Sequence, residues 1–276
     1  MIIDLVIELL PLIGMMVATG IVAGILAGLL GVGGGIVIVP VLDTALGLYG
    51  VNPEIRMHIA VATSLACIIL TSISSSKAHH AKGAVDFALA KVWGPAILVG
   101  SLLGTAIASY VDSTVLSGLF GIIALIAAIK MLLPLDDVNL SQDVPKGFAA
   151  PIPPVIIGSL SSMIGIGGGT LSVPTLTLMN QPIHRAVGTA AFFGLLISIP
   201  GTLGFIVSGF SDPRLPMASF GYVNLIGFAL IAPLTVRFAP VGAKLAHKLD
   251  KRKLSMVFGS FLFIVAVRMI YRTIIG

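Results

Sequence analysis

The chain has 276 residues, of which 57% are hydrophobic and only 10% are charged, and its mean hydropathy is +1.11. Because a soluble domain carries about 25% charged residues, this composition excludes a water-soluble protein and predicts an all-α polytopic membrane protein. The net charge of +5 does not indicate a nucleic-acid partner, because the basic residues lie near helix ends, where they set orientation in the membrane.

The first half of the chain is expected to hold about four transmembrane helices, the first of them broken by glycines. Pro11 lies near the start of the first apolar run, and Pro40 follows the break. The expected apolar segments are 2–30, 36–48, 58–76, 84–110 and 114–135, with polar loops at 49–57 and 77–83.

The second half is expected to repeat this arrangement after a polar linker at 136–147. The sequence therefore predicts two repeated halves, a first transmembrane repeat at 1–135 and a second at 148–276, each with a glycine-broken segment. The expected segments of the second half are 148–165, 170–179, 184–209, 219–238 and 254–275, with a turn at 180–182 and a loop at 210–218.

One glycine-rich motif occurs at corresponding places in the two halves. Residues 31–42 read Gly-Val-Gly-Gly-Gly-Ile-Val-Ile-Val-Pro-Val-Leu, and residues 165–176 read Gly-Ile-Gly-Gly-Gly-Thr-Leu-Ser-Val-Pro-Thr-Leu. Residues 58–64 likewise align with 184–190. Further residues recur at a constant offset, which indicates an internal duplication. They are Gly83, Pro95, Gly104, Asp112, Leu116, Gly121, Lys130 and Met131, which align with Gly221, Pro233, Gly242, Asp250, Leu254, Gly259, Arg268 and Met269.

The consecutive glycines predict a broken helix within the membrane. Such a break is tolerated only where protein or a water-filled cavity covers the free backbone groups. Two breaks in corresponding positions indicate a transporter's binding site, where a helix N-terminus can bind an anion. The rival interpretations are close helix packing, against which three consecutive glycines argue, and a dinucleotide-binding loop, which needs a strand–turn–helix unit. The predicted ligand-contacting glycines are Gly33, Gly34, Gly35, Gly167, Gly168 and Gly169.

Hydroxyl groups lie about one turn into the helix that follows each broken segment. Thr63, Ser64 and Thr189 are predicted to contact the ligand, because hydroxyls can hydrogen-bond an oxyanion in a low-dielectric site. The alternative for each hydroxyl is a hydrogen bond to the carbonyl four residues earlier in its own helix.

Cationic side chains accompany these hydroxyls. His58 and His184 occupy equivalent repeat positions, and Arg185 follows the second histidine. We expect all three to supply positive charge to the same site, since an arginine fork matches an oxyanion. The alternative is that they anchor helix ends at the headgroup level.

The sequence contains no pattern typical of an enzyme. It has no carboxylate pair, no Ser-His-Asp arrangement, no zinc motif and no nucleotide-binding loop. Cys67 lies in an apolar run and is interpreted as a packed core residue. The chain is therefore expected to be no enzyme and to bind no metal and no cofactor.

Charge predicts the orientation of the chain in the membrane. The stretch 237–253 holds six basic residues and one acid and is expected to be cytoplasmic, with the linker 136–147 on the opposite side. Four crossings per half would then place 49–57 and 180–183 in the cytoplasm and the N-terminus outside. The loop with Lys77 and Lys82 would also lie outside, against the positive-inside rule.

The orientation depends on whether the apolar pieces that follow the two glycine breaks cross the membrane. If the pieces 36–48 and 170–179 turn back instead, the parity of each half changes, and parallel repeats become inverted ones.

The doubled motif resembles the TauE/SafE family of sulfite exporters. The pattern Gly-x-Gly-Gly-Gly-x-x-x-Val-Pro-x-Leu occurs in both copies, and residues 187–189 resemble the family's Gly-Thr-Ser element. Ala62 replaces the glycine of that element in the first copy, and Ala190 replaces the serine in the second. The resemblance implies export of sulfite, sulfoacetate or a related sulfur-containing organic anion.

These expectations combine into one hypothesis, a secondary transporter of a small sulfur oxyanion in the cell (inner) membrane. The two breaks would face each other near the midplane, and the halves would rock about them. The alternatives are a passive anion channel and a non-transport membrane subunit of sulfur metabolism. The expected partners are the oxyanion and the lipid bilayer, and proton or ion coupling and a homodimer are both left open.

Overall fold

The structure is a computed structural model that describes residues 2–31, 33–133, 150–245 and 251–275. These residues form ten α-helices and one short β-hairpin, which confirms the predicted all-α polytopic membrane fold. The elements are α1 (Ile2–Leu30), α2 (Gly35–Leu48), α3 (Pro53–His80), α4 (Phe87–Ala108), α5 (Ser113–Leu132), α6 (Ile152–Ile164), α7 (Gly169–Leu178), α8 (Ile183–Gly209), β1 (Ser219–Phe220), β2 (Val223–Asn224), α9 (Leu225–Leu245) and α10 (Lys251–Ile275). The predicted linker at 136–147 lies outside the described residues.

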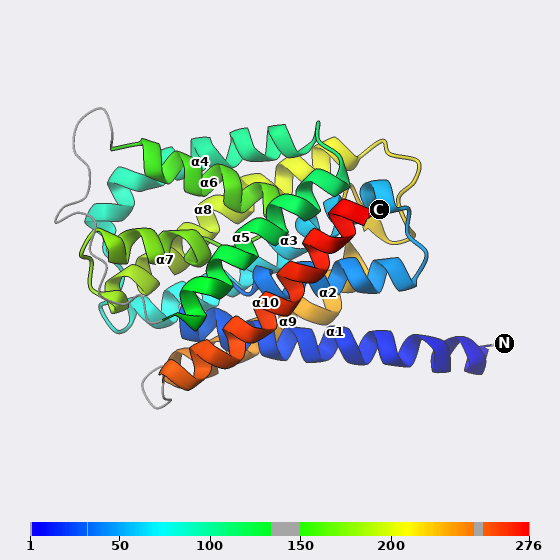
Figure 1. Ribbon diagram of the computed structural model, residues 1–276, viewed down its shortest axis with the longest axis horizontal. Coiled ribbons are helices and arrows are strands. Elements are labelled where there is room, and N and C mark those ends of the chain that lie inside the picture. Colours follow the sequence, from blue (N-terminus) through cyan, green and yellow to red (C-terminus); the bar gives the residue numbers. More distant parts are fainter. Residues whose placement is uncertain (1, 32, 134–149, 246–250, 276) are drawn as a thin grey trace.

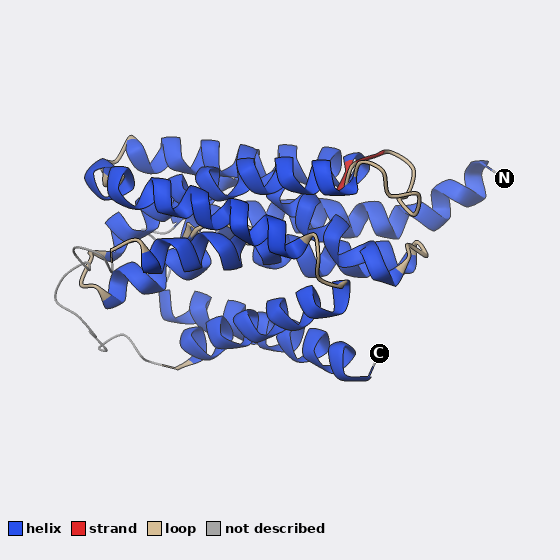
Figure 2. Ribbon diagram, turned by 90° about the horizontal axis from the view of Figure 1, so that it is seen from above, coloured by secondary structure: helices blue, strands red, loops and turns tan. Residues whose placement is uncertain are grey.

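The helices run roughly along one common direction, as expected for a membrane bundle (Figure 2). Six described helices are long and apolar enough to cross a membrane, namely α1, α3, α4, α5, α8 and α9, and two shorter apolar helices are α2 and α6. Helix α1 begins and helix α10 ends at the same end of the bundle, which we call the terminal end (Figure 1).

Helix starts follow local sequence signals, but two predicted boundaries are wrong. Helix α3 begins at Pro53 rather than at 58, because the Asn52 side chain accepts a hydrogen bond from the Glu54 backbone N–H at 2.9 Å. It continues to His80, so most of the predicted loop 77–83 is helical. The basic residues of this last turn are favourably placed at a helix C-terminus.

The predicted helix 219–238 begins later and ends later than expected. Residues Ser219–Phe220 pair with Val223–Asn224 in an antiparallel hairpin that turns at Gly221, whose φ is +55°. Helix α9 starts only after this hairpin and runs on through Pro240 to Leu245.

Helices of one half pack against helices of the other. Helix α1 lies along α9 and α4 along α6, while α3 lies against α8 and α5 against α10. A side-chain carbon added at Gly24 would meet Thr235, and one added at Gly158 would meet Ile97. Gly24 aligns with Gly158 and Ile97 aligns with Thr235, so the two contacts are equivalent in the two repeats, as expected for a duplicated chain. The boundaries of the two repeats stay a prediction.

The broken segments turn back within the bundle. Helix α1 runs away from the terminal end, and α2 returns to it, because Asp43 of α2 bonds Arg272 in the last turn of α10. In the second half α6 runs toward the terminal end and α7 runs away from it (Figure 1). Helices α3 and α8 are antiparallel, since His58 lies beside Phe205 and Gly188 beside Ala84. We infer that the two halves form an inverted repeat.

This reversal overturns three expectations about orientation, all of which assumed that the broken segments cross. Lys82 donates to the Ala243 carbonyl at 3.2 Å, so the loop 77–83 lies with the basic stretch 237–253. Gly259 contacts Leu132, so α5 ends where α10 begins, and the chain does not enter the linker on the opposite side.

The segments 49–57 and 180–183 likewise lie at opposite ends. Arg56 joins Asp43 at the terminal end, whereas Arg185 faces Asp86 at the other. We call this other end the basic end, defined by Lys77, Lys82, Arg185 and Lys244. From the positive-inside rule we infer that it is the cytoplasmic end, in which case the loop 77–83 obeys the rule.

Candidate functional site: the meeting of the two glycine breaks

The two glycine breaks contact each other in the middle of the bundle. A side-chain carbon added at Gly33 would lie 3.1 Å from the Gly167 Cα, and one added at Gly35 would overlap the Gly165 carbonyl. The same added carbon at Gly33 would lie 3.3 Å from Ile68, which is halfway along α3. The two breaks therefore meet near the middle of the bundle, as the sequence predicts, and the contacts of Gly33 with Gly167 and of Gly35 with Gly165 require residues without side chains. Contact of the six glycines with a ligand stays a prediction.

Helices α2 and α7 both begin at this contact. Neither has a side-chain hydrogen bond at its N-cap, which is Gly34 for α2 and Gly168 for α7. The first N–H groups of a helix have no partner within it, and the aligned peptide dipoles place about half a positive charge at that end. Two such ends therefore bring positive potential and free donors to the same place.

Ser64 is the one predicted hydroxyl that reaches the contact between the breaks. Its Oγ donates a hydrogen bond to the Gly165 carbonyl at 2.8 Å, and the side chain is fully buried. The bond satisfies a carbonyl at the C-terminus of α6, where the helix would otherwise leave it unpaired. Ser64 thus lies beside the breaks with its hydroxyl turned to the backbone of the second, and its contact with substrate stays a prediction.

The second break carries buried hydroxyls that the sequence interpretation missed. A side-chain carbon added at Gly194 would overlap Ser72 Oγ and would lie 3.8 Å from the Gly168 N–H nitrogen. Within the described chain, Ser72 Oγ, Thr170 Oγ1 and Ser172 Oγ have no hydrogen-bond partner. Buried hydroxyls without partners are costly, so each of the three is a candidate hydrogen-bond donor to a ligand. Thr170 and Ser172 project from different sides of α7, and Ser72 is the one placed beside the N–H of Gly168 by its contact with Gly194.

An aromatic pair lies beside this second break. Trp93 of α4 stacks on Phe193 with ring centroids 6.1 Å apart, and Phe193 in turn contacts Gly168. The Trp93 Nε1 is buried and has no hydrogen-bond partner among the described residues. It is a fourth unpaired donor in the same region of the bundle.

The signal for these residues is present in the repeat alignment. Gly194 aligns with Ile68, whose side chain covers Gly33 and Gly35 of the first break. The isoleucine that covers the first break is therefore replaced at the second by a glycine, beside which the Ser72 hydroxyl approaches the start of α7.

Thr63 and Thr189 occupy a different place, in which they join helices of opposite halves. Thr63 Oγ1 accepts a hydrogen bond from the Asn224 backbone N–H, and Thr189 Oγ1 accepts one from the Asp86 backbone N–H, both at 2.9 Å. Asn224 and Asp86 in turn accept hydrogen bonds from the N–H groups of Gly227 in α9 and Leu89 in α4. Their contact with substrate stays a prediction.

The predicted cations do not share a site with each other. His58 is buried near the terminal end, where its Nε2 lies 3.1 Å from the carbonyl oxygens of both Ala108 and Val111. His184 and Arg185 are exposed at the basic end, and an Arg185 nitrogen lies 3.9 Å from Asp86 Oδ2. At 1.5 Å per residue, the two ends of α8 are ~40 Å apart. The structure therefore does not bring these three side chains together.

A charged network ties the loop between α8 and α9 to α3 at the terminal end. Arg214 bonds Glu54 Oε2 at 2.6 Å and Asp212 Oδ2 at 2.7 Å, and the Tyr222 hydroxyl donates to Asp212 at 3.0 Å. The hydrogen bond from Arg214 holds the pKa of Asp212 well below its usual range. Burial, helped by the hydrogen bond to Asp212, raises the pKa of Tyr222 to about 12.

The described residues contain no group of three His, Cys, Asp or Glu side chains placed to hold a metal ion. Cys67 is fully buried, which confirms its interpretation as a core residue. The candidate site therefore offers backbone N–H groups, hydroxyls and an indole N–H, which are all suited to an anion.

Comparison with known proteins agrees with this arrangement. A model of the sulfite exporter TauE/SafE family matches residues 16–269. A probable membrane transporter protein of Haemophilus influenzae is 32% identical over 250 residues, which cover 91% of this chain and 95% of the relative. A probable membrane transporter protein of Methanocaldococcus jannaschii is 29% identical, and the match covers 98% of this chain and 100% of the relative. YunE of Bacillus subtilis, also named a probable membrane transporter protein, is 26% identical, and the match covers 94% of this chain and 97% of the relative. No solved structure matches the chain significantly.

These matches extend over nearly the whole chain, and the family model includes both glycine breaks and all six long apolar helices except the start of α1. The chain therefore belongs to the sulfite exporter TauE/SafE family and is a multi-pass membrane transporter.

Proposed function

We propose that the chain exports a small sulfur oxyanion, such as sulfite or an organosulfonate, by alternating access. The observation that carries this proposal is the convergence of the N-termini of α2 and α7 at the contact between the breaks. Two helix N-termini favour negative charge, and a membrane transporter can use broken helices for this purpose.

The groups around the second break favour an oxygen-rich anion over a cation. Ser72, Thr170, Ser172 and the Trp93 indole can all donate hydrogen bonds, and the described acids lie toward the two ends of the bundle. A sulfite or sulfonate group has three oxygens that can accept several such bonds at once. The substrate class rests on the family, since the relatives are named only as transporters.

The packing at the centre favours a transporter over an open channel. The breaks touch at Gly33 and Gly167, and Ser64 bonds the Gly165 carbonyl across the same contact. A ligand can reach the start of α7 only if the halves move apart, which is the motion that alternating access provides. A non-enzymatic role is part of the same proposal.

Thermal stabilisation of the purified full chain tests the substrate class. Sulfite and sulfoacetate should raise the melting temperature in a saturable way, because a ligand that binds only the folded state stabilises it, while chloride at equal ionic strength should not. The Ser72→Ala variant should require a higher sulfite concentration for the same shift. Equal shifts with chloride and sulfite, or no shift with any sulfur oxyanion, would contradict the proposal.

A further inference from the structure

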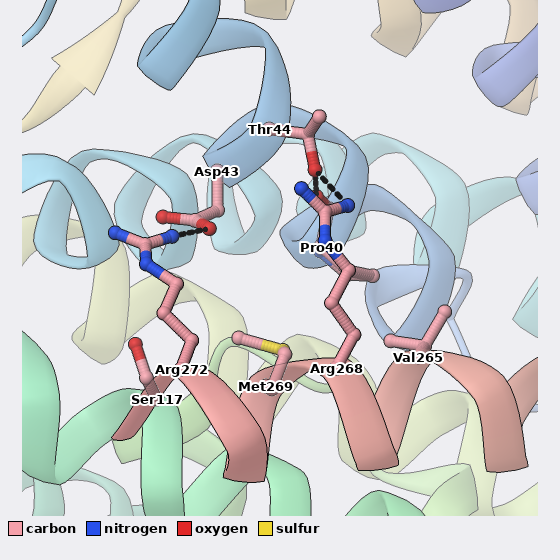
Figure 3. A pocket seen from close by; sticks show the side chains of 8 residues that line it. All are labelled: Pro40, Asp43, Thr44, Ser117, Val265, Arg268, Met269 and Arg272. Carbon is pink, nitrogen blue, oxygen red and sulfur yellow. Dashed lines mark hydrogen bonds and ion pairs between the residues drawn. The ribbon is translucent and has the colours of Figure 1, made fainter. Parts of the chain in front are cut away.

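A pocket at the terminal end lies between the outer half of α2, α5 and the last turns of α10 (Figure 3). Arg268 and Arg272 extend from α10 toward α2, one on each side of Met269, and the Ser117 hydroxyl lies below Arg272. The lining residues are Pro40, Asp43, Thr44, Ser117, Val265, Arg268, Met269 and Arg272.

Positive charge exceeds negative charge at this pocket. Asp43 is buried and bonds Arg56 through Oδ1 at 2.9 Å and Arg272 through Oδ2 at 2.6 Å. Arg268 donates to Thr44 Oγ1 at 2.8 Å, and Asp43 is the one acid among the lining residues. Three guanidinium groups therefore lie near a single carboxylate, whose two oxygens already bond Arg56 and Arg272.

Arg268 is exposed and lies on the same face of α10 as Ile264 and Tyr271, but its guanidinium turns toward α2 (Figure 3). A charged side chain on a membrane helix is costly and is kept where it has a function. Its present partner is a neutral hydroxyl, so its charge is not compensated there.

We infer that this pocket is a second oxyanion site, in which Arg268 and Arg272 bind a sulfonate, sulfite or phosphate group with the help of Ser117. A planar guanidinium offers paired N–H donors that match such oxygens. The inference deepens the proposed function, on which it rests. Helix α2 links the central contact at Gly35 to Thr44 over ~14 Å, so an anion leaving the centre toward the terminal end would meet this pocket.

The same chemistry occurs in a lipid phosphate, so the test has two arms. In the first, sulfite is titrated into the full chain in neutral detergent and followed by calorimetry. The wild type should bind two equivalents, and Arg268→Gln should lose one of them or bind it at least tenfold more weakly. Arg237→Gln, which removes an exposed arginine of α9, should keep both.

The second arm uses native mass spectrometry with phosphatidylglycerol. Loss of bound phosphatidylglycerol in Arg268→Gln, with sulfite binding unchanged, would support the pocket with a lipid headgroup as its ligand. The proposal is overturned if Arg268→Gln matches the wild type in both arms.

Thr44→Val separates binding from a purely structural tie. It removes the hydrogen bond to Arg268 but keeps the charge, so it should retain most of the second equivalent. If Thr44→Val loses that equivalent as completely as Arg268→Gln, Arg268 only ties α10 to α2 and the inference fails. Ser72→Ala should weaken binding of the sulfite equivalent at the second break. If Ser72→Ala has no effect but Arg268→Gln still removes one equivalent, the proposed central site is wrong and the pocket is supported.

Discussion

The two glycine breaks share a sequence motif but differ in backbone and surroundings. In the first break Gly31, Gly33 and Gly34 have φ values of +67°, +74° and +80°, whereas in the second Gly165, at +69°, has a positive φ and the N-cap Gly168 has a helical φ of −54°. Ile68 covers the first break, and the aligned residue beside the second is Gly194.

The side chains that follow the two breaks also differ, because those after the first break are apolar and those after the second include hydroxyls. Helix α2 begins Gly-Ile-Val-Ile-Val, and α7 begins Gly-Thr-Leu-Ser-Val. Duplication therefore supplied a helix break twice, and the first copy is apolar and conformationally constrained while the second carries hydroxyls that have no partner among the described residues. We interpret the first break as the structural member of the pair and the second as the ligand-binding member.

The largest expected effect comes from replacing one glycine with alanine in each break and comparing the two variants. Gly34→Ala should destabilise the fold, since a positive φ costs about 1–2 kcal/mol for alanine and the added carbon would lie 2.8 Å from the Ala23 carbonyl. Gly168→Ala avoids the φ cost, but its added carbon would lie 2.7 Å from the Ala190 carbonyl oxygen and 2.9 Å from the Gly194 nitrogen. It should therefore shift the start of α7 against α8 and lose most transport, and it should destabilise the fold less than Gly34→Ala, which adds the φ cost to a similar clash. The two variants are compared by folded yield, melting temperature and sulfite flux. Equal values for both variants would contradict the distinction between the two breaks.

The next prediction compares alanine variants of two aligned serines, Ser72 and Ser198. Ser72→Ala should raise the KM for sulfite roughly tenfold or more, because a hydrogen bond to a charged group contributes about 1.5–3 kcal/mol. Its melting temperature should not fall, since the hydroxyl has no partner among the described residues. Ser198→Ala removes the aligned hydroxyl, also buried and unpaired there, and serves as the control. An equal effect of both serines on KM would contradict the assignment of the second break.

The paired threonines give a smaller effect that should be the same in both halves. Thr63→Val and Thr189→Val should each lower stability by about 1–3 kcal/mol, because a backbone N–H loses its acceptor. If the threonines act mainly as ties between halves, KM for sulfite stays within twofold of the wild type. A raised KM at unchanged melting temperature would instead support their predicted contact with the substrate.

The smallest effect concerns the loop network, which is remote from both breaks. Asp212 has a lowered pKa, so its contribution to stability is present above the unfolded pKa of about 3.9 and is lost as pH falls through the lower folded value. Asp212→Asn should therefore change the melting temperature by the same small amount at pH 5 and pH 8. A difference between wild type and variant that grows from pH 5 to pH 8 would contradict this account of Asp212.

Composition and repeats predicted the membrane fold and the meeting of the glycines, because apolar length and consecutive glycines act locally on the backbone. The reversal after each break was not predictable, since a short apolar piece such as 36–48 can cross or turn back with the same residues. Thr63 and Thr189 were located in the right helices, but their partners Asn224 and Asp86 come from the other half. The replacement of Ile68 by Gly194 can be seen in the repeat alignment, but the contact of Ser72 with Gly194 depends on the packing of α3 against α8.

The most direct test of the central claim is counterflow of ³⁵S-labelled sulfite in proteoliposomes preloaded with unlabelled sulfite. The account predicts a transient accumulation of label with the wild type, because an alternating-access transporter exchanges substrate across the membrane. Ser72→Ala should show much less accumulation at a sulfite concentration below the wild-type KM while remaining folded, because its hydroxyl has no partner among the described residues. Simple equilibration without accumulation in the wild type, or full counterflow in Ser72→Ala, would contradict binding of the oxyanion at the second break.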